Sequence, residues 1–221
     1  NNDGVTATGP GTGPNNLQKF PVITKAVTDA ESNVYIKLTY SGTPNTYHRF
    51  DFYASAAPHS SGHGPGPIWL GACGQSTDAS GNLVMEATAG NGENVPAGTM
   101  ITCTVTDNGS MNSSEYAQNV ACTSGRLTVT NTSDAVNGNT SSVMDLIASP
   151  GPDGISLREA LMAANNNVNA WTNTHIHFDL PGSGAQTISP ASPLPPITSG
   201  VDVDGLSDPE YATTPVVRID G

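Results

Sequence analysis

The sequence is poor in charged and aromatic residues, and these shortages narrow the range of functions. Charged residues make up 12% of the 221 residues and aromatic residues 5%. Seven Lys and Arg stand against nineteen Asp and Glu, which gives a formal net charge of −12. Such a surface repels phosphate backbones and anionic lipids, so we expect neither a nucleic-acid nor a membrane-surface partner. No apolar run approaches the roughly 18 residues of a membrane span.

Several chemical motifs are also missing. The three cysteines form no C-x-x-C, which argues against a zinc ribbon or a thioredoxin-type site. Neither a G-x-S-x-G nucleophile elbow nor an EF-hand loop is present. The sequence therefore predicts a protein that is not an enzyme and has no catalytic residue and no cofactor. It begins at Asn1 without Met, which we interpret as the mature part of an exported protein, extracellular or at the cell surface.

Turn-forming residues are abundant, with 24 Gly and 17 Pro. Residues 1–16 are polar and rich in Gly and Pro, so we expect an extended N-terminal arm. Residues 17–124 contain strand candidates, several of which alternate apolar and polar side chains. Their spacing predicts an all-β, antiparallel, immunoglobulin-like sandwich. The seven candidates are 20–29, 33–42, 47–55, 67–77, 83–90, 99–107 and 114–122.

Residues 125–221 have a different pattern, with one convincing helix. Ser156 occupies an N-cap position and Glu159 follows three residues later, the spacing of a capping box. An apolar stripe follows at helical spacing: Leu157, Ala160, Leu161 and Ala164. Short apolar segments come next, at 175–180, 186–190, 194–198, 201–205 and 216–221. Such segments predict the coils of a short parallel β-helix (a solenoid), with one capping α-helix over its core.

This second half resembles a known type of sequence. The run from Ser156 to Asn165 reads S-L-R-E-A-L-M-A-A-N, and Ile176, Phe178, L-P-P-I at 194–197 and V-D-V-D-G at 201–205 follow in order. The pattern resembles the CSLREA region of bacterial and archaeal exported surface proteins, except that Ile155 stands where that family has Cys. The resemblance implies the N-terminal capped start of a right-handed parallel β-helix.

Residues 13–124 resemble a module that accompanies such regions. The matching segments are G-P-N-N-L-Q-K-F-P at 13–21, 50–53, W-L-G at 69–71, 77–82 and 104–116. The resemblance implies an immunoglobulin-like module, but it does not specify an activity. Relatives of this kind continue through more coils than fit before Gly221. We therefore expect either a piece of a longer surface protein or a coil end covered by another subunit.

A few residues are candidates for sites. Asp78, Asn82 and Asp107 lie in Asp/Asn-rich turns, where calcium is one hypothesis and ordinary turn hydrogen bonding the other. If the turns at 78–82 and 108–112 close the same end of the sandwich, Cys73 and Cys103 could form a disulfide between the sheets. Cys103–Cys122 is the alternative pairing. Arg158 is expected to brace a carboxylate or backbone carbonyls. Four N-x-S/T sequons are candidate glycan acceptors: Asn108, Asn112, Asn131 and Asn139.

The sequence leads to three functional hypotheses. The first is a structural or cell-surface protein, a filament subunit whose N-terminal arm adds a strand to an identical neighbour. The second is a carbohydrate-binding or adhesin module, which would show exposed aromatic side chains. Trp69 is expected in the core, and this weakens the second hypothesis. The third is a fragment of a β-helical polysaccharide-degrading enzyme, the least favoured because the active groove of such enzymes lies further along the coils.

Overall fold

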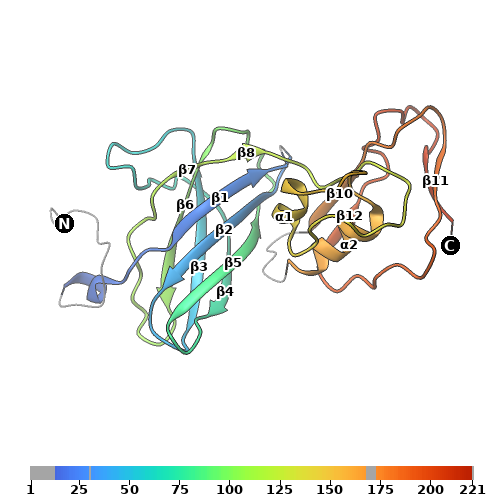
Figure 1. Cartoon of the computed structure of the whole chain (residues 1–221). Coiled ribbons are helices and arrows are strands. Elements are labelled where there is room, and N and C mark those ends of the chain that lie inside the picture. The colour runs from blue at the N-terminus through green and yellow to red at the C-terminus, as the bar shows by residue number, and fades with distance from the viewer. Residues whose placement is uncertain (1–12, 30, 168–172, 221) are drawn as a thin grey trace. The chain divides into compact units, whose positions relative to one another are not determined.

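The computed structural model describes residues 13–29, 31–167 and 173–220. The chain folds as two compact units, with the junction between Ser124 and Gly125 (Figure 1). The described residues form thirteen β-strands, two α-helices and one short 3-10 helix. The protein is therefore predominantly β, as the sequence predicts.

The first unit begins with a four-stranded sheet. Its strands are β1 (Val22–Thr28), β2 (Val34–Ser41), β5 (Asn82–Ala89) and β8 (Thr123–Ser124), in the order β5-β2-β1-β8. The pairs β5-β2 and β2-β1 are antiparallel, and β8 runs parallel to β1. The long strands β1, β2 and β5 lie side by side in Figure 1.

A second four-stranded sheet is antiparallel throughout. Its strands are β3 (Tyr47–Ser55), β4 (Ile68–Ser76), β6 (Met100–Asp107) and β7 (Val120–Ala121), in the order β4-β3-β6-β7. The alternation of β3 buries Phe50 and Phe52, while Asp51 between them points to the other face. This alternation is the one that the sequence predicts.

One apolar core joins the two sheets. Ile36, Leu38 and Met85 from the first sheet and Phe50 and Phe52 from the second belong to the same buried cluster. Both sheets therefore bury one face against the other.

The predicted strands match the observed ones with two differences. Six of the seven candidates are strands close to their predicted bounds, but the last, 114–122, contains only β7. The hydrogen bonds of this segment are irregular, and Ser114 and Ala117 donate singly to β6. At the end of the expected arm, η1 (Pro14–Leu17) is a short 3-10 turn, and residues 1–12 lie outside the described residues.

The second unit contains parallel strand pairs. Strands β9 (Thr128–Val129), β10 (Thr174–Phe178) and β12 (Val201–Val203) form one sheet in the order β12-β10-β9. Strands β11 (Gln186–Ile188) and β13 (Val217–Ile219) form a second parallel pair. The chain thus returns three times to lay a strand beside an earlier one in the same direction.

Two helices accompany these strands. Helix α2 (Leu157–Asn165) begins at Ser156 with the predicted capping box. The expectation of a single helix was wrong, because α1 (Val143–Ala148) precedes it. Ser142 caps α1 by accepting the backbone N–H of Asp145. The helix has only six residues, too few for an apolar periodicity to be recognised in the sequence. Neither helix is long and apolar enough to cross a membrane.

Candidate functional site

The turn at Asp78 is held by its own side chain. Asp78 Oδ1 accepts the backbone N–H groups of Ser80 and Asn82, both at 2.8 Å. This is the local hydrogen bonding for which Asp is favoured in turns. In the described part of the chain, neither Asp78 nor Asp107 belongs to a group of three or more metal-ligating side chains. Calcium at these turns stays a prediction of the sequence.

Asp107 organises the neighbouring turn in the same way. Its Oδ1 accepts the N–H groups of Gly109 at 2.8 Å and Ser110 at 2.9 Å. Its Oδ2 accepts the Thr43 hydroxyl at 3.1 Å and lies 3.7 Å from Nε2 of the buried His48. Burial pushes the pKa of Asp107 upward, but these hydrogen bonds outweigh it, and the pKa lies below its ordinary value. Asp107 therefore acts as a structural carboxylate.

All three cysteines are free thiols, so the predicted disulfide between Cys73 and Cys103 was wrong. Cys73 in β4 and Cys103 in β6 lie in the same sheet, on opposite sides of β3, where they pair with Phe50 and Phe52. Two strand spacings separate their backbones by about 9–10 Å, beyond the reach of a disulfide. Cys122 donates its backbone N–H to Thr99, about four residues along β6 from Cys103, so the alternative pairing also fails.

Arg158 braces the second unit through a paired carboxylate and backbone carbonyls, as predicted. Its Nε and Nη2 donate to the two carboxylate oxygens of Asp134, both at 2.9 Å. The same guanidinium donates to the carbonyls of Ser192 and Pro193. Asp134 also accepts the N–H of Ala191 at 2.9 Å. The pair thus ties helix α2 to the segment after β11.

Glu159 is fully buried, and its carboxylate closes two turns at once. Oε1 accepts the N–H groups of Asn137 at 2.6 Å and Gly138 at 2.7 Å. Oε2 accepts the N–H of Ser156 at 2.9 Å and its hydroxyl at 3.0 Å. The sequence predicted the contact with Ser156, but not the contact with the loop at 137–138. The Glu159 carboxylate thus holds the loop at 137–138 against the start of helix α2.

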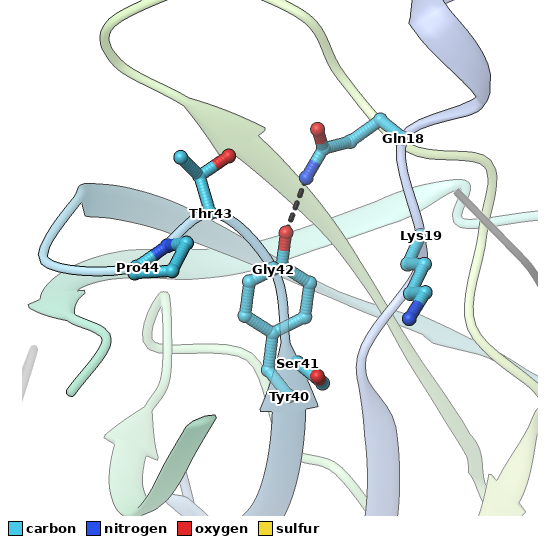
Figure 2. A pocket seen from close by; sticks show the side chains of 7 residues that line it. All are labelled: Gln18, Lys19, Tyr40, Ser41, Gly42, Thr43 and Pro44. Atoms are coloured by element: carbon cyan, nitrogen blue, oxygen red, sulfur yellow. Dashed lines mark hydrogen bonds between the residues drawn. The ribbon is translucent and has the colours of Figure 1, made fainter. Parts of the chain in front are cut away.

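A hollow lies beside Tyr40 in the first unit (Figure 2). Its volume is about 220 Å³, and Gln18, Lys19 and residues 40–44 line it. The Gln18 amide donates to the Tyr40 hydroxyl (Figure 2). The Tyr40 ring packs edge-on against His48. Burial, followed by the charge of Asp107, raises the pKa of Tyr40 to about 12. The Tyr40 hydroxyl therefore stays neutral at ordinary pH.

The outer face of the second sheet carries exposed aromatic side chains. Trp69 is 40% exposed, so its expected place in the core was wrong. The pairing of β3 and β4 shifts register between Phe52 and Tyr53, so that Leu70 is buried and Trp69 pairs with Tyr53 on the other face. Its indole N–H donates to Asp51 at 3.1 Å. This register shift depends on the partner strand, so the sequence of β4 alone does not show it.

In the second unit, apolar burial fades along the stacked strands. Val129 in β9 and Ile176 in β10 are fully buried, whereas Val203, the register partner of Ile176, is 42% exposed. Ile188 in β11 is buried, whereas its partner Ile219 in β13 is 49% exposed. We call strands β12 and β13 the last coil. It carries apolar side chains that no further described strand covers.

Comparison with known proteins adds no assignment. No family model matches the chain, and no curated protein matches it significantly. The resemblance to CSLREA regions therefore stays a prediction of the sequence. The last coil and the aromatic face are the two surfaces that require a functional explanation.

Proposed function

We propose that this chain is a non-enzymatic structural protein of the cell surface or extracellular space that self-associates through its last coil. The observation that carries the proposal concerns apolar residues that are register partners on neighbouring parallel strands. In each pair the residue on the earlier strand is buried and its partner on the later strand is exposed. Val203 repeats Ile176, and Ile219 repeats Ile188, yet only the earlier member of each pair is covered. Stacked coils bury each side chain against the next coil, so an uncovered last coil favours a further layer.

We infer that the second unit is the capped start of a right-handed parallel β-helix. The parallel pairings of β9, β10 and β12 and of β11 and β13 support this inference. Parallel crossovers are right-handed in nearly all proteins. We infer likewise that the first unit is an immunoglobulin-like sandwich. Its two sheets with a common core support that inference.

A structural role agrees with how the ionisable side chains are used. Glu159 closes turns, Asp134 pairs with Arg158, and Asp107 holds a turn. A general acid or base needs a proton that is exchangeable near the working pH. These carboxylates are instead held by several donors each, which supports a scaffold.

The occupant that we propose for the last coil is a second copy of this chain. Each copy offers the same exposed apolar side chains, and no further strand of the described residues pairs with the outer edges of β12 and β13. Edges of this kind readily pair with another strand. The net charge of −12 opposes the approach of two copies, so association should strengthen as salt screens this repulsion.

Sedimentation velocity over a wide concentration range tests the proposal. We expect the unmodified chain to associate, more strongly at high salt, and to form ordered assemblies visible by electron microscopy. Ile219→Lys and Val203→Lys should abolish association because each places a charge on the last coil. Val84→Lys is the matched control, since Val84 is exposed on the first unit and should tolerate the change.

Three results would overturn this version of self-association. One is a chain that stays monomeric up to about millimolar concentration at high salt. Another is association that Ile219→Lys leaves unchanged. The third is association that is lost when residues 1–12 are deleted but kept in both lysine variants, which would favour strand addition by the N-terminal arm instead.

A further inference from the structure

The outer face of β3 and β4 carries a row of aromatic and charged side chains that the self-association proposal does not use. Tyr47, Arg49, Asp51 and Tyr53 alternate along β3 on the face opposite the core. Trp69 joins them from β4, paired with Tyr53. We call these five residues the aromatic strip. Seven residues of an extended strand place Tyr47 and Tyr53 about 20 Å apart along it.

Asp51 holds the middle of the aromatic strip in a fixed arrangement. It accepts two hydrogen bonds from Arg49, at 2.9 and 2.8 Å, through both carboxylate oxygens. It also accepts the indole N–H of Trp69 at 3.1 Å. The Asp51 side chain is only 14% exposed, whereas that of Arg49 is 54% exposed. The carboxylate therefore positions a guanidinium and an indole that both remain accessible to solvent.

Small residues let the tyrosine rings lie close to the sheet. A Cβ added to Gly74 would come within 1.8 Å of the Tyr47 hydroxyl, so that ring crosses β4 where a side chain would otherwise stand. Gly66 is similarly close to the Tyr53 side chain, 2.4 Å from a Cβ at position 66 to the Tyr53 Cβ. Tyr53 packs edge-on against Tyr116 at a centroid distance of 5.4 Å. The rings are thus supported by neighbours before any ligand arrives.

We propose that the aromatic strip binds a neutral oligosaccharide. A pyranose ring has an apolar C–H face that packs on an aromatic ring, and hydroxyls at its rim that bond to planar charged groups. The strip has this combination, with Trp69 and Tyr47 flanking the Arg49–Asp51 pair. Rigid, preorganised aromatic groups give up little conformational entropy on binding.

The charge of the strip and of the protein favours a neutral ligand. The Arg49 charge is balanced by Asp51, so the strip offers no excess positive charge. The chain as a whole carries −12, which repels uronates and sulfated glycans. An exposed strip whose charges are balanced suits a linear oligosaccharide that lies along β3. Water can bridge the sugar hydroxyls that make no direct hydrogen bond.

Tryptophan fluorescence can isolate this site. The chain has only two tryptophans, Trp69 and Trp171, so Trp69 is the single tryptophan of the Trp171→Phe variant. The probes are neutral cello-, xylo-, manno- and malto-oligosaccharides, with a polygalacturonate oligomer as the anionic comparison. We expect at least one neutral series to shift the emission, with affinity rising with chain length as more of the strip is covered.

Variants of the strip then locate the binding. In calorimetry with the responsive oligosaccharide, Trp69→Ala and Arg49→Ala should each weaken binding at least tenfold, and Trp69→Phe by less. Met111→Ala, at an exposed residue outside the strip, is the control and should bind normally. Circular dichroism checks that each variant is folded, and Trp69→Phe keeps the test valid if Trp69→Ala is not.

The proposal is wrong if no neutral series binds, or if binding is indifferent to Trp69→Phe, Trp69→Ala and Arg49→Ala. It is also wrong if the anionic oligomer binds best. If Trp69→Ala instead reduces sedimentation-detected self-association, the strip is a contact between copies rather than a glycan site. The oligosaccharide results do not bear on the last coil, whose variants are tested separately by sedimentation.

Discussion

The two units of this protein bury their apolar side chains in contrasting ways. In the first, two sheets face each other, and the core is closed on itself. In the second, strands stack in parallel, and burial falls from Val129 and Ile176 to Val203. A closed sandwich limits its own size, whereas a stack leaves an uncovered layer at its end. The difference suggests a division of labour between a self-sufficient module and an extendable one.

The largest expected effect is the difference in thiol reactivity between the folded and the unfolded first unit. All three cysteines lie in that unit. Burial, with a smaller effect of Asp51, raises the pKa of Cys73 to about 12, and burial raises that of Cys103 well above normal. Near neutral pH this lowers the thiolate population of Cys73 about a thousandfold relative to an exposed thiol. We expect Ellman's reagent to react very slowly until the first unit unfolds.

Labelling during urea unfolding checks this expectation. Thiol reactivity should rise as the first unit unfolds, and it should not depend on the unfolding of the second unit. Rapid modification of the native protein would contradict the buried positions of Cys73 and Cys103.

Deleting an aromatic ring from the closed core should be the most destabilising single truncation. Phe52→Ala is expected to cost about 3–5 kcal/mol in the free energy of unfolding, because Phe52 is fully enclosed. Ile219→Ala, in the last coil, should cost less than about 1 kcal/mol in dilute protein. Urea titrations of both variants measure the contrast. An equal loss would mean that the last coil is better covered than the described strands indicate.

Removing the buried carboxylate of Glu159 should destabilise the second unit selectively. Glu159→Ala leaves the N–H groups of Asn137, Gly138 and Ser156 without their acceptor. We expect a loss of about 3 kcal/mol, since each buried donor without a partner costs about 1–3 kcal/mol. Ser156→Ala, which removes only the cap hydroxyl, should cost about 1 kcal/mol.

Differential scanning calorimetry, with thiol labelling as the reporter of the first unit, separates the two effects. A shift in the transition of the first unit in Glu159→Ala would show that the two units do not unfold independently.

The smallest expected effect is the loss of stability of the second unit at low pH. Hydrogen bonding by Arg158 lowers the pKa of Asp134 below its ordinary value. A carboxyl with a lowered pKa in the folded state contributes stability above its unfolded pKa of about 4, and this contribution is lost as pH falls through the folded value. Because the pair is near the surface, we expect about 1 kcal/mol or less. Asp134→Asn should flatten the acid side of the stability profile of the second unit, and an unchanged profile would contradict the assignment.

Local sequence patterns predicted the helices and strands themselves better than they predicted which strands lie next to each other. Alternation identified β3 and β2, and the S-x-x-E spacing identified the start of α2 at Ser156. These signals depend only on side chains a few positions apart. Helix α1 was not predicted, because six residues are too few to show a helical periodicity.

The errors concern contacts between distant segments. The pairing of Cys73 with Cys103 assumed that they belong to opposite sheets, but β4 and β6 flank β3 in one sheet. Trp69 was expected in the core, whereas the register shift beside Tyr53 turns it outward. The exposed Trp69 and the uncovered Ile219 depend on strand order and register, which one sequence does not reveal.

The direction of the strands in the last coil has a consequence for symmetry. Two identical edges related by a twofold axis, with their apolar faces on the same side, must meet antiparallel. Such a contact closes on itself and ends at a dimer. Continuing the parallel arrangement of β10 with β12 requires a different surface on the incoming copy, and repetition of that contact produces an open, polar polymer. In the proposed self-association, the direction of one strand therefore decides between pairs and fibres.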